Sequence, residues 1–436
     1  MLRSVAIDTL VSVGGEDVMR LHPQGFRGRR GISRREFLRR AGATGIALPS
    51  LAAILAACGG SSTSGGDGTT APPIARPDAP VELPLYDDIP PIADDLEPEA
   101  GPLKIYNWND YVYKKVINKF QDQYGVEVEY TQFDGMSQAI SKISSDAVEF
   151  DVFFPTLENL GKLVAAKLLQ PINHTYLPNF EKNIWPELQD PFYDEGSRYS
   201  VPYLTWKTGI GYRADEVDDP GSLSNPLDVL WDPMFEGKIG VLDEYRETIG
   251  YALLHLGIDD LNTTDAADIE AAKEDLLKLV PLKVDTAGSD YQMLADGSSW
   301  VRLSWSGNMN YARWYLPKGT PVSVLGYYYP PEGGWEVSND LMVISKDAEN
   351  PVLAHHFMNF LMDVDNGLAN FSYEGFQPPF EGVSDADFMK AGYIPRNLAN
   401  TLVTRKDFQT GQRVLAIPPE ADAMWQEAWS EFKAGV

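Results

Sequence analysis

Cysteine is almost absent from this chain, since Cys58 is the only one among 436 residues. A single cysteine cannot form an internal disulfide or a cysteine-rich metal site. Catalytic signatures are also lacking, because the sequence contains no Gly-x-Ser-x-Gly, no His-Glu-x-x-His and no Gly-x-x-x-x-Gly-Lys. We therefore expect neither an enzyme nor a metal site or cofactor.

Basic residues are few, with 36 Lys and Arg against 63 Asp and Glu and a formal net charge of −27. Residues 1–57 hold nine of the basic and four of the acidic residues, so the rest of the chain carries about −32. Nucleic acids and anionic membrane surfaces both require a basic footprint. The charge excludes both as the main partner and is compatible with a cationic ligand.

The N-terminal region has the pattern of an export signal. SRREFL (33–38) contains a twin-arginine pair, and a weakly apolar run over 41–57 ends in LAAC (55–58). LAAC has the form of a bacterial lipobox, in which the cysteine is lipidated and becomes the new N-terminus. We predict that 1–57 is a signal peptide for the twin-arginine pathway. Lipidated Cys58 would then hold the mature protein at the extracytoplasmic, periplasmic face of the membrane.

Two points about this region stay open. The run over 41–57 can also be interpreted as a buried core helix followed by a chance cysteine. An acidic Glu16-Asp17 is unusual before a signal, so the start is either Met1 or Met19. Residues 58–102 are rich in Gly, Ser, Pro and acidic residues, and this composition predicts a disordered tether.

Residues 103–436 are too many for one core and predict two lobes. Trp108 and Tyr111 follow the first predicted strand of this part, and Thr156 and Glu158 follow the third. Because ligands of parallel α/β sheets bind beyond the carboxyl ends of the strands, these four residues are expected at a binding rim. The predicted strands are 103–107, 126–131, 151–154 and 341–344, and the predicted helices are 112–123, 136–144, 157–167, 266–280, 351–362 and 421–433. GIGYRA (209–214) nominally fits a dinucleotide fingerprint but opens no helix, which favours a strand between the lobes.

A series of short motifs runs in order through 103–436. They are IYNWNDYV (105–112), DVFFPT (151–156), VPY (201–203), DEYRE (243–247), NTTD (262–265), SWSG (304–307) and PEGG (331–334), which leads to Asp340. Behind an export signal and tether, this series resembles the spermidine/putrescine-binding proteins of bacterial ABC transporters. The resemblance implies an α/β, two-lobed periplasmic-binding-protein-like fold of type II. Each lobe would be a mixed, mainly parallel sheet flanked by helices, with 103–208 plus 338–384 in lobe 1, 209–337 plus 385–436 in lobe 2, and a hinge between them.

The resemblance also implies a ligand and a site. A protonated polyamine, putrescine or spermidine, would lie between the lobes, with carboxylates on its ammonium groups and aromatic rings over its methylenes. The matching positions predict the ligand-binding residues Trp108, Tyr111, Thr156, Glu158, Glu244, Glu247, Trp305, Asp340 and Phe376. The implied partners are the permease subunits of an ABC importer, and the implied state is a monomer.

Several positions depart from the family pattern. Ser338 stands where the family commonly has a tryptophan, and Trp335 lies nearby in a segment that is one residue longer. Phe376 lacks the hydroxyl of the family's tyrosine, and Glu158 adds a carboxylate. These departures leave the identity of the amine open.

Alternatives remain at the level of the residues and of the function. The aromatic residues can be ordinary core, and Glu244 and Glu247 can be an exposed helix face. Asp340 can be a turn or cap residue, and Glu158 a helix first-turn charge. A binding protein for another small cationic or amino compound, a secreted hydrolase using Glu244 and Glu247, and a membrane-coupled sensor are the alternative functions.

Overall fold

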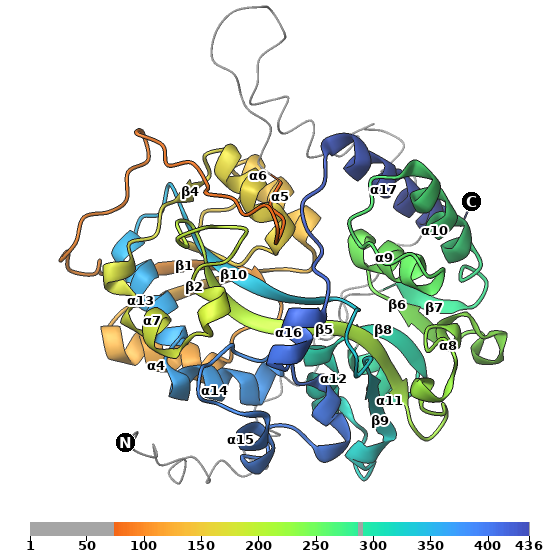
Figure 1. Cartoon of the computed structure of the whole chain (residues 1–436). Coiled ribbons are helices and arrows are strands. Elements are labelled where there is room, and N and C mark those ends of the chain that lie inside the picture. Colours follow the sequence, from red (N-terminus) through yellow and green to blue (C-terminus); the bar gives the residue numbers. More distant parts are fainter. Residues whose placement is uncertain (1–73, 287–290, 436) are drawn as a thin grey trace, which may run out of the picture. The chain divides into compact units, whose positions relative to one another are not determined.

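Ten strands join into one mixed sheet in the computed structural model, which describes residues 74–286 and 291–435 (Figure 1). The order along the sheet is β2-β1-β3-β10-β5-β8-β6-β7, with β4 also paired to β10 and β9 to β5. The strands are β1 (Leu103–Trp108), β2 (Val128–Phe133), β3 (Val152–Phe153), β4 (Leu169–Gln170), β5 (Val201–Arg213), β6 (Ile239–Val241), β7 (Lys283–Thr286), β8 (Val301–Trp305), β9 (Leu325–Tyr328) and β10 (Val337–Ser345).

The first part of the sheet follows the predicted strand–helix alternation. β1 pairs in parallel with β2 and with β3, and the helices α4 (Lys114–Tyr124), α5 (Met136–Ser144) and α6 (Leu157–Ala165) connect or follow these strands. α4 forms because its apolar residues recur at helical spacing, so that Val116, Ile117 and Phe120 are buried together. It ends at Gly125, whose φ of 69° is the left-handed conformation that glycine adopts at little cost.

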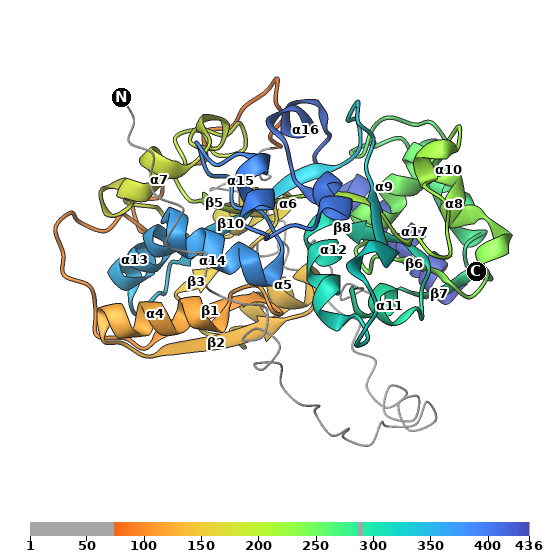
Figure 2. The same cartoon turned by 90° about the horizontal axis from the view of Figure 1, so that it is seen from below.

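Two long strands, β5 and β10, connect the two halves of the sheet. The first half of β5 pairs antiparallel with β10, and its second half pairs antiparallel with β8 and β9. Figures 1 and 2 both show β1, β2, α4 and α13 on one side of these strands and β6, β7 and α8 on the other. The chain therefore passes from one half to the other along β5 and back along β10.

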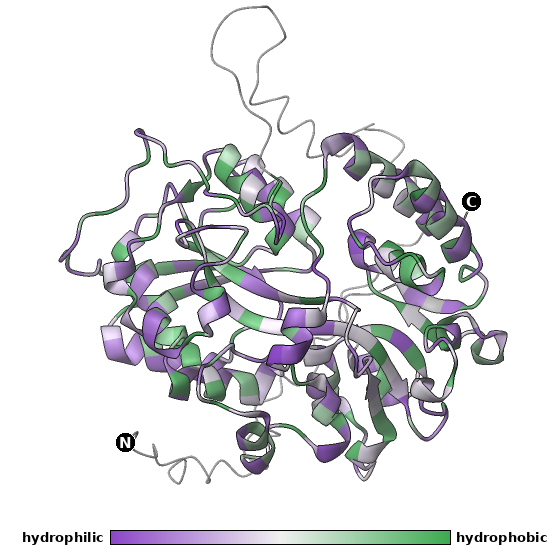
Figure 3. Ribbon diagram, in the orientation of Figure 1, coloured by the Kyte–Doolittle hydropathy of each residue, from purple (hydrophilic) through white to green (hydrophobic). Residues whose placement is uncertain are grey.

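The remaining helices cover both halves. Asp265 caps α10 by accepting a hydrogen bond from the backbone N–H of Ala267. Figure 3 shows hydrophobic and hydrophilic residues alternating along outer helices such as α10 and α17, as expected where one face packs on a core. These helices are α7 (Pro178–Asn183), α8 (Asp228–Trp231), α9 (Tyr245–His255), α10 (Ala266–Leu277), α11 (Tyr291–Asp296), α12 (Ser306–Ala312), α13 (Pro351–Leu361), α14 (Val364–Glu374), α15 (Asp385–Lys390), α16 (Arg405–Thr410) and α17 (Pro419–Ala434).

Buried apolar side chains gather in separate cores. One core includes Ile105, Phe120 and Phe357 and lies around β1, α4 and α13. A second core surrounds Ile210 and Leu303 on β5 and β8, and a third joins α9, α10 and α17. Separate cores on the two sides of β5 and β10 are what two lobes require. The lobe boundaries given above stay a prediction.

The tether prediction is wrong for residues 74–102. This segment (orange in Figure 1) runs extended along the folded part and is held by hydrogen bonds and by buried Leu83 and Ile89. The backbone N–H of Val81 donates to Phe192 O at 2.8 Å, and the Tyr199 hydroxyl donates to Pro84 O at 2.7 Å. Composition suggested disorder because the segment has few apolar residues, but partners elsewhere in the chain satisfy its backbone groups.

The remaining predictions concern the dinucleotide-like motif GIGYRA and the N-terminal region. GIGYRA (209–214) lies at the end of β5 and opens no helix, so the interpretation as a strand is confirmed. The predicted signal peptide, Cys58 and the first part of the tether lie outside the described residues. Within 74–286 and 291–435, each helix is too short or too polar to traverse a bilayer.

Candidate functional site

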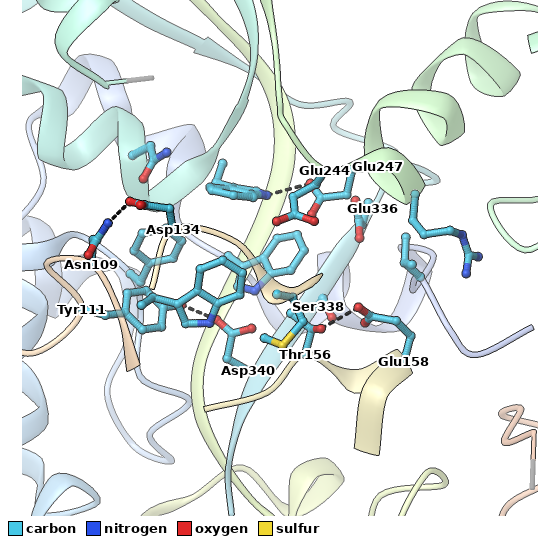
Figure 4. A pocket seen from close by; sticks show the side chains of 18 of the residues that line it. Asn109, Tyr111, Asp134, Thr156, Glu158, Glu244, Glu247, Glu336, Ser338 and Asp340 are labelled. Carbon is cyan, nitrogen blue, oxygen red and sulfur yellow. Dashed lines mark hydrogen bonds between the residues drawn. The ribbon is translucent and has the colours of Figure 1, made fainter. Parts of the chain in front are cut away.

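All nine residues predicted to bind ligand line one cavity. They come from segments spread between positions 108 and 376, and the structure brings them together where β1, β3, β5, β8 and β10 approach one another (Figure 4). The lining residues are Trp108, Asn109, Tyr111, Phe133, Asp134, Met136, Thr156, Glu158, Trp206, Glu244, Tyr245, Arg246, Glu247, Tyr291, Trp305, Asn308, Glu336, Ser338, Asp340, Phe376 and Val414. Each was predicted from a match to the family pattern, and its role in binding a ligand stays a prediction.

Trp108 forms part of the cavity wall at the carboxyl end of β1. Its indole N–H donates to Phe154 O at 3.1 Å, and its ring lies 4.8 Å from that of Phe133. The main-chain N–H of Trp108 donates to the side chain of buried Asn107 at 2.7 Å. These contacts fix the indole while it remains partly exposed to the cavity.

Asp340 lies opposite an irregularity in β5. The pairing register of β10 with β5 shifts between Asn339 and Leu341, where two steps along β10 lie opposite three steps along β5, so the extra residue belongs to β5. The alternation along β10 is kept, and the Asp340 carboxylate faces the cavity. Asp340 lies inside the strand, because β10 begins at Val337 rather than at the predicted residue 341.

The Asp340 carboxylate is held by a hydroxyl. The buried Tyr111 side chain donates a hydrogen bond to Oδ2 of Asp340 (Figure 4). Burial raises the pKa of Asp340 to about 7, although hydrogen bonds from Tyr111 and Trp206 act in the opposite direction. This site favours a cation, because a positive charge would stabilise the ionised form.

Aromatic packing supports Tyr111 from behind. The ring of Phe376 meets that of Tyr111 edge-on with centroids 5.1 Å apart, and Tyr203 does so at 5.4 Å. Gly307 allows Phe376 to approach, since a Cβ at position 307 would lie 2.2 Å from its ring. Phe376 thus contributes a ring and no hydroxyl, as its sequence implies.

Glu158 lies in the first turn of α6, beyond the end of β3. Its Oε1 accepts hydrogen bonds from the Thr156 hydroxyl at 2.5 Å and from the Asn159 amide at 2.8 Å. An acidic residue at this place is favoured by the helix dipole. Glu158 also lines the cavity, so the two interpretations of this residue are compatible.

Glu244 and Glu247 stand at the start of α9. Oε2 of buried Glu247 accepts from the Trp305 indole at 2.7 Å and from the Thr208 hydroxyl at 3.1 Å. Burial, reinforced by neighbouring carboxylates, raises the pKa of both Glu244 and Glu247. The contacts of Glu247 are incompatible with the alternative of an exposed helix face for this residue.

Arg246, between these two glutamates, does not neutralise them by hydrogen bonding. Its guanidinium donates to Leu415 O at 3.0 Å and to Leu261 O at 3.0 Å, and it lies 4.5 Å from the Trp425 ring. Arg246 is the one basic side chain lining the cavity among the described residues. The cavity therefore combines several carboxylates with aromatic faces.

Sequence reasoning missed Glu336 and Trp206. Glu336 precedes β10 by one residue, and the period of two along a strand puts it on the same face as Ser338 and Asp340. That alternation was a usable signal for Glu336. Trp206 pairs with Ser338 across β5 and β10, so a neighbouring strand supplies an indole beside the position where the family tryptophan is missing.

Trp335 does not line the cavity. Its ring packs edge-on against Tyr251 at 5.5 Å, Tyr328 at 5.7 Å and Tyr329 at 6.2 Å. It is 9% exposed and belongs to the second core. Trp206, not Trp335, is the indole next to Ser338.

Comparison with known proteins identifies the family. The model for bacterial extracellular solute-binding proteins matches residues 115–394. This chain belongs to that family. The solute-binding protein is 31% identical over 344 residues to the spermidine/putrescine-binding periplasmic protein of Salmonella typhimurium, with 76% of this chain and 92% of that relative covered. It is 29% identical over 272 residues to the putrescine/cadaverine-binding protein of Pseudomonas aeruginosa, with 61% of this chain and 76% of that protein covered.

Solved structures support the fold. A putative spermidine/putrescine ABC transporter protein from Listeria monocytogenes superposes with a TM-score of 0.64 at 28% identity, covering 76% of the solute-binding protein and 98% of that chain. A lipoprotein of Treponema pallidum gives the same TM-score at 21% identity with the same coverage, and this likeness concerns the fold alone. The predicted two-lobed periplasmic-binding-protein-like α/β fold and the predicted family are confirmed.

Proposed function

We propose that this protein is the lipid-anchored, extracytoplasmic substrate-binding component of an ABC importer and captures a polyamine in its cavity. One observation carries the proposal: six carboxylates and three indoles converge on a single cavity that holds only one basic side chain among the described residues. Desolvated ammonium groups need paired charges, and indole faces cover methylenes and attract cations by about 0.5–2 kcal/mol. The relatives named for spermidine, putrescine and cadaverine support the same ligand class.

The residue roles follow from the contacts. Asp340, oriented by Tyr111, would pair with one ammonium group, and Glu244 and Glu247 with another. Trp108 and Trp305 would cover the methylene stem between them, with Phe376 behind Tyr111. Thr156 and Glu158 would contact the ligand from the start of α6.

Capture and delivery would depend on movement of the lobes. β5 and β10 both connect the halves, and closure about them would bury the ligand. Two contacts already join the halves. The Tyr291 hydroxyl donates a hydrogen bond to Asp110 at 3.3 Å, and the Lys162 ammonium lies 3.5 Å from the Asp422 carboxylate. The closed monomer would then dock on permease subunits while lipidated Cys58 keeps it at the membrane.

The hydrolase alternative is weaker. A glycosidase places its two carboxylates on opposite sides of the bond that it cleaves. Glu244 and Glu247 lie three residues apart at the start of one helix, and Glu247 is occupied by Trp305 and Thr208. This arrangement suits holding a cation.

Titration calorimetry of the purified protein with putrescine and then spermidine tests the proposal. The protein is first unfolded and refolded so that no carried-over ligand remains. We expect a dissociation constant of about 1 μM or lower, and a loss of about ten-fold or more in Trp108→Ala and in Asp340→Asn. Asp347→Asn, an exposed carboxylate just after β10, is the matched control and should bind as the unmodified protein does.

Two results would count against the proposal. Absence of heat and of thermal stabilisation with both amines would show that the cavity takes another compound. Equal losses of amine affinity in Asp347→Asn and Asp340→Asn would show that binding depends on surface charge and not on the cavity.

A further inference from the structure

One end of the cavity holds more carboxylates than a single ammonium group requires. Glu158 comes from α6, Glu244 and Glu247 from the start of α9, and Glu336 from the residue before β10. Figure 4 shows Glu244, Glu247 and Glu336 beside one another and Glu158 on the same side, while Asp340 and Tyr111 lie toward the other side. We refer to these four residues as the glutamate end.

Glu336 is the member that points most clearly to a missing partner. It is 1% exposed, and its Oε2 has no hydrogen-bond partner among the described residues. A buried carboxylate oxygen without a donor costs free energy, so such atoms are normally paired. Glu336 lines the cavity, so a bound cation can supply the donor.

The protein does not neutralise the glutamate end by itself. The Arg246 guanidinium donates its hydrogen bonds to Leu415 O, to Leu261 O and to the side chain of Asn262. Glu158 and Glu247 accept bonds from neutral hydroxyl, amide and indole groups. When these carboxylates are ionised, Arg246 offsets only part of their negative charge, and a ligand can balance the rest.

We propose that Glu336 and Glu158, together with Glu244 and Glu247, bind two ammonium groups, so that the preferred ligand is a linear polyamine with three or more amines. This inference rests on the proposed polyamine-binding function. A diamine places one ammonium group at Asp340 and one at the glutamate end. The glutamate end holds four carboxylates and one arginine. One ammonium group there leaves the ionised end with a buried net negative charge, and a second ammonium group reduces the free-energy cost of burying that charge.

Proton linkage agrees with this geometry. Burial and the nearby carboxylate of Glu158 raise the pKa of Glu336 to about 8. Burial and neighbouring carboxylates likewise raise the pKa of Glu244 and Glu247. Glu336 therefore carries a proton at neutral pH when the cavity is empty, and an ammonium group that pairs with it displaces that proton.

Calorimetry with putrescine, spermidine and spermine at one ionic strength tests the inference. We expect spermidine or spermine to bind about ten-fold more tightly than putrescine, as one further charged hydrogen bond provides. Glu336→Gln should weaken the binding of spermidine and spermine about ten-fold more than that of putrescine, and so remove most of that preference. Glu332→Gln, exposed and four residues earlier, is the control and should keep the preference.

A second readout separates charge from shape. Titrations in two buffers of different ionisation enthalpy report protons released on binding. Release should be larger with spermine than with putrescine, and smaller in Glu336→Gln. Thermal unfolding checks that each variant is folded.

The possible failures are distinct. If putrescine binds as tightly as spermidine and spermine, or if Glu336→Gln weakens all three equally, the glutamate end binds one ammonium group and the inference is overturned. If none of the three amines binds, the proposed function fails, and the inference falls with it.

Discussion

Asp340 shows how a single residue can link pH, stability and ligand binding. It is 4% exposed, and its carboxylate has the Tyr111 hydroxyl as a neutral donor and no cation beside it. Burial raises its pKa to about 7 from an ordinary value of 3.8. At a pH between these two pKa values, Asp340 of the free protein therefore keeps its proton in the folded state and has lost it in the unfolded state.

The stability of the free protein should depend on pH through this residue. Because the pKa is raised by folding, the contribution of Asp340 is fully favourable below about pH 4 and is lost as pH rises toward 7. The side chain of Asp340→Asn cannot ionise. The unfolding free energy of this variant, relative to that of the unmodified protein, should therefore increase by about a few kcal/mol between pH 4 and 8. Urea unfolding at several pH values measures this difference.

The opposite trend would contradict the assignment. If the difference between Asp340→Asn and the unmodified protein shrinks as pH rises, the carboxylate is stabilised in its ionised form. Saturating polyamine should reverse the dependence, because an ammonium group favours the ionised carboxylate.

At the scale of secondary-structure elements, the parallel part of the sheet was predictable and the details of β10 were not. β1, β2 and α4 follow from apolar periodicity in the local sequence, and this periodicity survives in the structure. The irregularity in β5 opposite Asp340 depends on how β10 registers against β5, a contact between residues more than a hundred positions apart. Glu336 was readable from strand alternation once β10 was known to start at Val337.

The segment 74–102 could not be predicted for a similar reason. Its prolines and acidic residues are typical of disorder, yet its partners come from distant positions. Arg198 donates to Leu83 O at 2.9 Å, and the Tyr176 hydroxyl donates to Ala93 O at 2.7 Å. The backbone N–H of Leu353 donates to the Glu99 carboxylate at 2.8 Å. Composition carries no information about such partners.

Removal of this segment should destabilise the folded part. A protein that begins at residue 103 loses these hydrogen bonds and the burial of Leu83 and Ile89, whereas one that begins at residue 74 keeps them. Burying one such side chain contributes about 1.5–3 kcal/mol, and ordering the segment offsets part of this. We expect the shorter protein to unfold at a lower urea concentration, with an unfolding free energy that is lower by about a few kcal/mol. Equal midpoints would mean that 74–102 is only loosely attached.

At the scale of the whole molecule, the excess of acidic residues acts on the ligand before contact. The chain carries 63 acidic and 36 basic residues, and the cavity lining repeats this imbalance. A field of this sign raises the local concentration of a cationic ligand and speeds its encounter with the protein. Contacts inside the cavity, in contrast, are screened by salt much less than the exposed charges.

Salt should therefore change how fast a polyamine binds more than how fast it leaves. Between about 20 and 300 mM salt the screening length shortens several-fold, so the association rate constant should fall several-fold, while the dissociation rate constant changes little. Stopped-flow tryptophan fluorescence can follow both rates, because Trp108, Trp206 and Trp305 line the cavity. An uncharged solute at equal osmolarity is the control. If salt instead accelerates dissociation and leaves association unchanged, solvent-accessible ion pairs hold the ligand, and the acidic surface plays no part in steering it.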